Sequence, residues 1–512
     1  MRPEPAERLP RVLALVLPEL PLQRALRARS AHGQLAVVEG DRVVHCTAPA
    51  RAAGARPGDS LVQARAACAD LAAVPLEPAK DRAALRALAE ALLSLAPAVE
   101  VAFPDSLLLD ASAAGIGGGT SEEAETGLAE RALALCRSLG WRGRAGIASG
   151  KGPAQMLARH GAQEVVRAAP GEAARALARL PLTALQLPSG MEARLAAVGV
   201  TDVGALSRLP PETLAHRFGP AGAQAVRLAC GEDPRPLVPF APETFPEESW
   251  DLEGTEVGVL ESAEPVLFAV KRLADRVATR LAGRGLGAGR LRLTLGLYPR
   301  GEERLDLSLA RPSADAALWL VPLRERVGNL RLPAPVRELK LSVVEAAEVP
   351  AEQLVAGDRP EATRALEVVL SRLAARLGDV SLLAARAVDR HRPEAAYQLA
   401  RFEVPSLHRA PGEGEEGDPG GGAGPVSLRP TRLLRLPRPV VAEGEGGRLT
   451  VLRLDGCAHD VVALAGPERL AGEWWSQPFD RDYYRVRLEG VGDVWVYRDG
   501  RDGRLYLHGY FD

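Results

Sequence analysis

The chain has 512 residues, which is enough for three or four domains of ordinary size. It is 46 % hydrophobic and 25 % charged, a composition typical of folded rather than disordered proteins. The formal net charge is −2, so no overall basic field indicates nucleic acid, and any DNA contact must come from a local patch. The apolar run at 12–17 is broken by Pro18 and Pro21 and is too short for a signal or membrane helix, so we expect a cytoplasmic protein without membrane contact.

The five cysteines are widely separated and include no C-x-x-C pair. Cys457 and His459 lack the further ligands that a zinc site needs. We therefore expect reduced thiols, no metal site and no cofactor.

The first region, residues 1–175, mixes strand and helix patterns. The apolar run at 11–17 predicts a buried strand, and residues 33–45 predict a hairpin that turns at 39–41. Further strands are expected at 98–103, 106–110 and 144–148, and helices at 60–70, 81–95 and 121–139. This irregular alternation predicts an α/β or α+β domain.

Residues 176–240 have a helical pattern punctuated by Gly and Pro. A helix at 192–198, a tight turn at 199–201 and a helix at 202–207 follow one another, and Asp202 is placed as the N-cap of the second helix.

Residues 245–345 predict a small sheet with helices on one face. Apolar residues recur every three or four positions at 265–281, as on a helix that packs on a core. Strands are indicated by alternating apolar residues at 291–297, 305–309 and 336–343, and residues 346–348 are expected to lie between units. Within 265–340 there are 15 Lys or Arg and 7 acidic residues, an excess of eight positive charges that favours phosphate contact. Solvated arginine-rich faces would give the same count.

The last third divides at a Gly-rich stretch. Residues 346–425 combine a helical pattern at 360–387 with a flexible linker at 409–425. Residues 426–512 are rich in aromatic residues, and strand patterns at 493–498 and 504–508 predict a β-rich module whose aromatics form its core or a docking surface.

Three stretches together resemble the body of the Y-family (UmuC-like) lesion-bypass DNA polymerases. They are Ala-Ala-Gly-Ala-Arg-Pro-Gly at 52–58, Phe-Pro-Asp-Ser-Leu-Leu-Leu-Asp at 103–110 and Gly-Ile-Ala-Ser-Gly-Lys at 146–151. The resemblance implies a multidomain α/β (α+β) fold with palm and fingers at 1–175, a helix-hairpin-helix thumb at 176–240 and a little finger at 245–345.

The tail resembles that of one branch, the ImuB family. The matching stretches are 389–394, 466–469, Trp474-Trp475, 481–484 and 507–511. This resemblance implies a role in damage-induced translesion synthesis and mutagenesis, as an adaptor that binds primer–template DNA. The implied partners are an ImuA-type RecA-like protein, an error-prone DnaE-type polymerase that performs synthesis, and the sliding clamp. The module at 426–512 would dock partners.

The acidic residues of the polymerase site are incomplete. Nucleotidyl transfer needs two divalent ions held by carboxylates, and active relatives supply one Asp on the first strand and an adjacent Asp-Glu pair on the hairpin. Here the first strand has no acid, Asp105 is kept and Ser106 replaces the second acid, while Asp110 lies beyond the pair. We therefore expect a degenerate site and no catalysis. An active polymerase that uses Mg²⁺ with Asp105, Asp110 and Glu19 is the alternative, and a DNA binder without protein partners is a third.

Candidate DNA contacts follow from charge and from the resemblance. Lys151 corresponds to a lysine near nucleotide phosphates, and we expect it on the surface or facing DNA. The turn at 199–201 can offer backbone N–H groups to a phosphate. The complete set of candidates is Lys151, Gly199, Thr201, Lys271, Arg272, Arg276, Arg290 and Arg292. In the family a clamp-binding peptide follows the little finger; here Gln353-Leu354 stands at that place without the bulky anchors that such binding uses.

Overall fold

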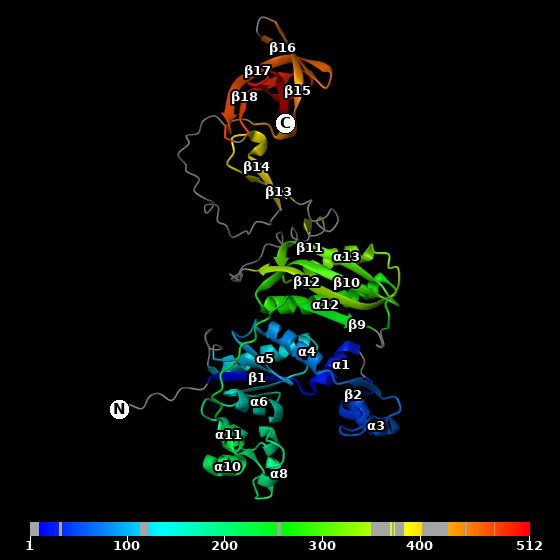
Figure 1. The fold of residues 1–512 in the computed structure, drawn as a ribbon, viewed down its shortest axis with the longest axis vertical. Coiled ribbons are helices and arrows are strands. Elements are labelled where there is room, and N and C mark those ends of the chain that lie inside the picture. Colours follow the sequence, from blue (N-terminus) through cyan, green and yellow to red (C-terminus); the bar gives the residue numbers. More distant parts are fainter. Residues whose placement is uncertain are drawn as a thin grey trace, which may run out of the picture. The chain divides into compact units, whose positions relative to one another are not determined.

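The computed structural model describes residues 10–29, 33–112, 121–252, 258–349, 369–370, 373, 383–401, 429–445, 448–475 and 477–511. The chain divides into two compact units, Met1–Asp379 and Val380–Asp512, each with cores of its own (Figure 1). This is the mixed α/β, multidomain class with a β-rich C-terminal part that the sequence predicts. Within the described residues, no helix has both the length and the apolar character to cross a membrane.

A five-stranded sheet forms the centre of the first unit, in the order β5-β6-β1-β7-β8. Its strands are β1 (Arg11–Val16), β5 (Val99–Ala102), β6 (Ser106–Asp110), β7 (Arg144–Ser149) and β8 (Val165–Arg167). The predicted first strand is confirmed, and the structure places it at the centre of the sheet, where β1 pairs antiparallel with both β6 and β7.

Helices cover both faces of this central sheet. Leu13 and Leu15 of β1 pack with α4 (Pro78–Leu92) and α5 (Ser121–Ser138). Val12, Ala14 and Val16 face the opposite way, into a core shared with α6 (Lys151–His160). Since both faces are buried, β1 is apolar along nearly its whole length instead of alternating.

A smaller sheet follows α1 (Leu20–Arg29) in the chain and has the order β3-β2-β4. Its strands are β2 (Leu35–Glu39), β3 (Arg42–Cys46) and β4 (Ala72–Pro75), and it packs with α2 (Ala48–Ala52) and α3 (Leu61–Ala67). The predicted hairpin is confirmed, and a capping box between Ser60 and Gln63 starts α3.

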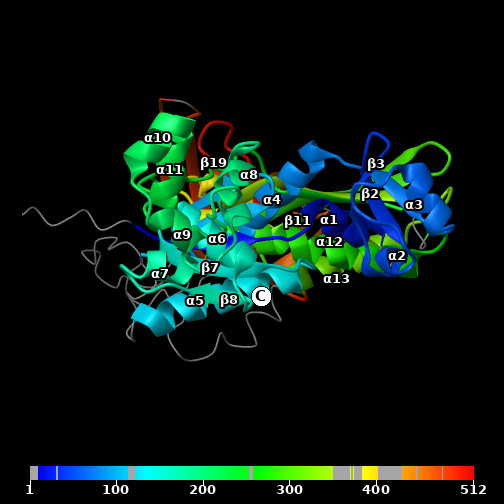
Figure 2. The same ribbon diagram turned by 90° about the horizontal axis from the view of Figure 1, so that it is seen from below.

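Short helices continue the chain after the central sheet. They are α7 (Ala173–Leu177), the 3₁₀ turn η1 (Leu182–Leu185), α8 (Met191–Ala196), α9 (Val203–Ser207), α10 (Pro211–Phe218) and α11 (Pro220–Ala229). The Asp202 carboxylate accepts the Ala205 N–H at 2.7 Å, so the predicted N-cap is confirmed. Figure 1 shows α8, α10 and α11 below α6, on the side of the central sheet that α6 covers, with the small sheet to their right. Figure 2 shows the same elements from below.

A four-stranded sheet of order β11-β10-β12-β9 completes the first unit. Its strands are β9 (Glu247–Asp251), β10 (Leu286–Leu297), β11 (Glu302–Ser313) and β12 (Val336–Glu348). As predicted, two helices, α12 (Ala263–Gly283) and α13 (Ala316–Gly328), pack on one face of the sheet around a single core. Residues 346–348 do not lie between units, because β12 continues through them and Glu348 pairs with Leu286 of β10.

The second unit contains a closed antiparallel barrel. Its strands are β15 (Arg432–Glu445), β16 (Arg448–Leu454), β17 (Cys457–Gly472), β18 (Phe479–Leu488), β19 (Gly492–Asp499) and β20 (Leu505–Tyr510). β15 pairs with β20 and thereby closes the barrel. Tyr483, Trp495 and Tyr497 are buried together, as expected for core aromatics, whereas Trp474 and Trp475 are exposed.

A hairpin of β13 (Leu383–Ala387) and β14 (Tyr397–Arg401), joined through η2 (Pro393–Ala395), belongs to the same unit. Glu394 lies 3.0 Å from Arg481 and 3.5 Å from His508 of the barrel. Burial lowers the pKa of His508 to about 4, so this ring is neutral at pH 7. The predicted helix at 360–387 is wrong at 383–387, where the chain forms a strand. The predicted Gly-rich linker at 409–425 lies outside the described residues.

Candidate functional site

The ends of β1 and β6 meet at the position of the predicted degenerate site. Val16 lies opposite Ser106 in the strand register, and the Leu17 N–H donates to the Asp105 carbonyl at 2.8 Å. The residue beside Ser106 on the neighbouring strand is therefore an apolar valine. At this place the sheet brings Asp105 and Ser106 together without an acid from β1.

An arginine occupies the space in front of the Asp105 carboxylate. Arg159, near the end of α6, donates to Asp105 Oδ1 at 2.5 Å and to Ser106 Oγ at 2.9 Å. The Ser106 hydroxyl donates to the same Oδ1 at 2.7 Å. The side chains of Arg159 and Asp105 are both only partly exposed. The Arg159 guanidinium supplies the positive charge that balances the Asp105 carboxylate.

The other two acids considered for a metal site point elsewhere. Glu19 accepts from Arg51 at 3.2 Å and lies 4.0 Å from His45, next to the small sheet. Asp110 is at the far end of β6, opposite Val12, and accepts the Ser112 N–H. Across the part of the chain that the structure describes, no three His, Cys, Asp or Glu residues gather as metal ligands. A pair of Mg²⁺ ions needs several carboxylates at one place, and this donor set does not fit it.

Lys151 is buried, so the expected surface position is wrong. The residue is 7 % exposed, and its ammonium lies 2.6 Å from Glu100 of β5. The next residue, Gly152, donates its N–H to Asp233 at 2.8 Å, which places an internal carboxylate at the N-terminus of α6. Burial alone would raise the pKa of Asp233, but hydrogen bonds from Arg235 and Gly152 outweigh it and the pKa is lowered.

The turn between α8 and α9 is open to solvent. Gly199 has φ +82 with nothing near the place of a Cβ, and Thr201 is exposed. The N–H groups of Gly199 and Val200 donate to the carbonyls of Ala196 and Leu195, where they close α8. A phosphate could approach this turn, although these two donors already have partners.

The face of the four-stranded sheet opposite α12 forms a groove of about 510 Å³. Its polar lining includes Arg292, Thr294, Glu302, Arg304, Arg337, Glu338, Lys340 and Ser342. Several of the cations are held in exposed ion pairs: Arg292 with Asp306 at 2.7 Å, Lys340 with Glu247 at 2.8 Å, and Arg304 with Glu302. Arg290, two residues before Arg292 and not part of the lining, lies 3.4 Å from Glu345. We call this surface the sheet groove.

The candidate residues of α12 divide between two environments. Lys271 is exposed and pairs with Asp275 at 2.7 Å. Arg272 instead donates to the carbonyl of Arg27 on α1 at 3.0 Å and stacks over Trp250. Arg276 is only 13 % exposed and lies 3.7 Å from Glu248.

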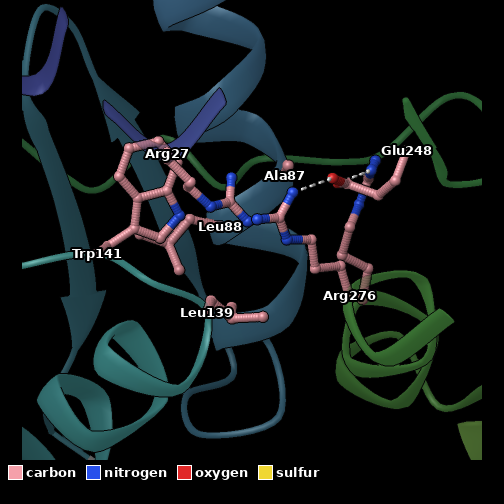
Figure 3. A pocket seen from close by; sticks show the side chains of 8 residues that line it. Arg27, Ala87, Leu88, Leu139, Trp141, Glu248 and Arg276 are labelled. Atoms are coloured by element: carbon pink, nitrogen blue, oxygen red, sulfur yellow. Dashed lines mark hydrogen bonds and ion pairs between the residues drawn. The ribbon is translucent and has the colours of Figure 1, made fainter. Parts of the chain in front are cut away.

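Arg280, the next arginine of this row, is bound by a buried carboxylate of α4. It makes ion pairs with Glu90 at 3.1 Å and with Glu248 at 3.0 Å. Figure 3 shows the neighbouring side chains, with Arg27 beside Trp141 and Arg276 reaching toward Glu248. We call this contact between α1, α4 and α12 the arginine joint.

Several residues of these sites had no clear signal in the sequence. Arg159, Glu100 and Asp233 act through partners more than fifty residues away. A signal for the arginine joint was present, because residues 272, 276 and 280 are spaced by four and therefore lie on one side of α12. Gln353 and Leu354 of the predicted clamp peptide lie outside the described residues.

Comparison with known proteins agrees with this fold. Residues 22–159, which include the small sheet and the strands β5, β6 and β7 of the central sheet, match the impB/mucB/samB family. The first unit thus contains a Y-family-like domain.

The likeness extends beyond that domain. The chain is 28 % identical over 484 residues, 90 % of its length and 100 % of the relative's, to Protein ImuB of Caulobacter vibrioides strain NA1000 / CB15N. The same identity and coverage hold for Protein ImuB of strain ATCC 19089 / CIP 103742 / CB 15. Over most of its length, the chain is therefore similar to these two ImuB proteins.

Proposed function

We propose that this protein is a non-catalytic, polymerase-like adaptor in damage-induced translesion synthesis and mutagenesis, which binds primer–template DNA and recruits an error-prone DnaE-type polymerase. One observation carries the non-catalytic part. Arg159 binds Asp105 at the place where active relatives would hold metal ions, while Ser106 and Val16 stand where further acids would be needed.

Metal chemistry explains why an arginine, a serine and a valine at this place would prevent catalysis. Each divalent ion contributes several kcal/mol of stabilisation to the charge that develops on transferring phosphoryl oxygens. A guanidinium next to Asp105 opposes the binding of a second cation there, and serine cannot replace a bridging carboxylate. The alternative, an active polymerase, would need Glu19 and Asp110 to leave their present partners and reach Asp105.

Metal binding provides a direct test of this part. Titration of the full-length protein with Mn²⁺, followed by electron paramagnetic resonance of the free ion, should give the same curve for wild type and for Asp105→Asn. Tight binding of one or two ions that disappears in Asp105→Asn would support the active alternative.

DNA binding by the sheet groove is the second part of the proposal. The groove supplies arginine and lysine side chains at an exposed surface, and its cations are held by solvent-exposed carboxylates that a phosphate can displace. We assign the main contacts to Arg290, Arg292, Arg304 and Lys340. Lys271 and the turn at 199–201 are accessible for secondary contacts.

The recruitment of partners is assigned to the second unit. Trp474 and Trp475 are adjacent and 79 % and 67 % exposed, and large aromatic side chains often anchor protein interfaces. We propose that this unit docks the ImuA-type and DnaE-type proteins, and that a clamp contact by Gln353-Leu354 is weak. A simple DNA binder would need no such exposed pair.

Truncation separates these roles. A chain ending at Asp379 keeps the first unit intact and should bind primer–template DNA like the full chain, but it should lose both partners in co-purification. A full-length Trp474→Ser, Trp475→Ser variant is the matched control for loss of the surface without loss of the unit. If the truncated chain retains both partners, the recruiting role of the second unit is refuted.

A further inference from the structure

The arginine joint contains a small cavity whose lining is rich in positive charge. Of the eight residues that line it, three are arginines (Arg27, Arg276 and Arg280) and one is a glutamate, Glu248. The remaining lining residues are Ala87, Leu88, Leu139 and Trp141, which form an apolar wall (Figure 3). Glu90, which does not line the cavity, forms an ion pair with Arg280 and offsets part of its charge. The cavity therefore has more positive charge than its own acids balance.

Arg27 is the least compensated of these arginines. Its guanidinium lies over Trp141 at 4.5 Å, and its Nε is buried without a hydrogen-bond partner among the described residues. Burial, together with the like charge of Arg276, lowers the pKa of Arg27 to about 9. Burial likewise lowers the pKa of Arg276 to about 10. Both shifts mean that the surroundings disfavour two neighbouring positive charges.

The size of the cavity limits which negative group could balance the positive charges of Arg27 and Arg276. Its volume is about 10 Å³, close to that of one water-sized sphere. A phosphate, sulfate or carboxylate does not fit this space, whereas a monatomic ion fits after small movements of the long arginine side chains. A buried charge without a partner is strongly unfavourable, so a negative ion is favoured over a neutral water at this position.

We propose that the arginine joint binds one chloride-sized anion between Arg27 and Arg276. The anion supplies the missing negative charge and accepts the unpaired N–H of Arg27. It thereby ties α1 to α12, and so fixes the four-stranded sheet against the central sheet within the first unit. This inference does not depend on the proposed adaptor function.

Thermal unfolding of the full-length protein tests the site. Unfolding would be followed by calorimetry in sodium chloride and in sodium gluconate mixtures of constant ionic strength. Linkage predicts that the transition of the first unit rises by about 2 °C for each tenfold rise in chloride near saturation. Arg276→Met should remove this dependence. Lys271→Met, on the exposed side of the same helix, should keep it.

Chloride nuclear magnetic resonance gives a direct readout that does not need a variant. Bound chloride should broaden the ³⁵Cl line of the wild-type solution, and added bromide should narrow it by competition. Equal transitions in both salts together with no excess line width would mean that the cavity holds water only, and the proposal would be overturned. Broadening that persists in a folded Arg276→Met protein would place the anion elsewhere and would also overturn it.

Discussion

The sheet groove and the arginine joint take their arginines from the same stretch of sequence but place them in opposite environments. In the groove, Arg292 and Arg304 are 41 % and 64 % exposed, and each pairs with a carboxylate that is itself exposed. In the joint, Arg276 and Arg280 are both 13 % exposed and meet Glu248 and the buried Glu90. Charge alone does not distinguish the two groups.

The difference teaches which charges are available to a ligand. Exposed ion pairs contribute little to stability and exchange readily with a phosphate. Buried pairs resist exchange, because removing one partner leaves an uncompensated charge. The excess of eight positive charges in residues 265–340 therefore overstates the positive field that DNA would meet. Some of these charges belong to arginines buried in the arginine joint, such as Arg280, which binds Glu90.

The largest expected effect comes from breaking the joint. Glu90→Gln removes the more deeply buried of the two carboxylates that bind the 13 % exposed Arg280, leaving only Glu248, and should destabilise the first unit by about 2–4 kcal/mol. Denaturant unfolding of the full chain measures this change. Asp275→Asn removes an exposed carboxylate of α12 and should change stability by less than about 0.5 kcal/mol. Similar losses in the two variants would contradict the distinction between buried and exposed pairs.

Removing the groove cations should weaken DNA binding next most strongly. In a triple Arg292→Ala, Arg304→Ala, Lys340→Ala variant, the slope of log affinity against log salt should flatten by up to about three units. Affinity for primer–template DNA at physiological salt should fall by roughly 10- to 100-fold. Fluorescence anisotropy over a salt series provides both values.

The joint arginines give the matched control for this experiment. Arg272→Gln with Arg276→Gln removes two charges from the same segment, yet the salt slope should stay within experimental error of wild type. If the salt slope flattens in the Arg272→Gln, Arg276→Gln variant and not in the groove variant, DNA binds to α12 and not to the sheet groove.

A smaller effect of opposite sign is expected from Asp306. The hydrogen bond from Arg292 lowers the pKa of this carboxyl group, so it is ionised at pH 7 and competes with phosphate for the guanidinium. Asp306→Asn should therefore raise DNA affinity by about two- to fivefold, within the usual range for one exposed pair. Asp275→Asn makes the same charge change away from the groove and should raise affinity less. An unchanged or lower affinity in Asp306→Asn would argue against Arg292 as a phosphate contact.

Local patterns predicted most of the elements of the first unit. The apolar run of β1 and the stripe of α12 were readable because burial on one or both faces imposes a period on the sequence. The strand at 383–387 was misassigned, since its short Leu-Ala-Ala-Arg-Ala pattern fits a helix equally well until its partner β14 is known. Closure of the barrel through β15 and β20 joins segments about seventy residues apart, and no local pattern indicates it.

The candidate sites were less predictable than the fold. The absence of an acid from the first strand and the serine at position 106 were visible in the sequence, because both concern the identity of the residues. The ion pair between Arg159 and Asp105 was not visible in the sequence, because Arg159 reaches Asp105 only through the packing of α6 on the sheet. Lys151 was expected at the surface, yet Glu100 and the chain near Asp233 enclose it. Contacts between distant segments therefore account for these errors.

Primer extension tests the central claim, that the body is kept while its metal site is lost. Purified full-length protein would be mixed with a primed template and all four deoxynucleotides, with Mg²⁺ or Mn²⁺, beside Asp105→Ala as the background. Because Arg159 already binds the remaining carboxylate, wild type should extend the primer no further than Asp105→Ala in either metal. Template-directed extension by wild type that Asp105→Ala abolishes would contradict the account.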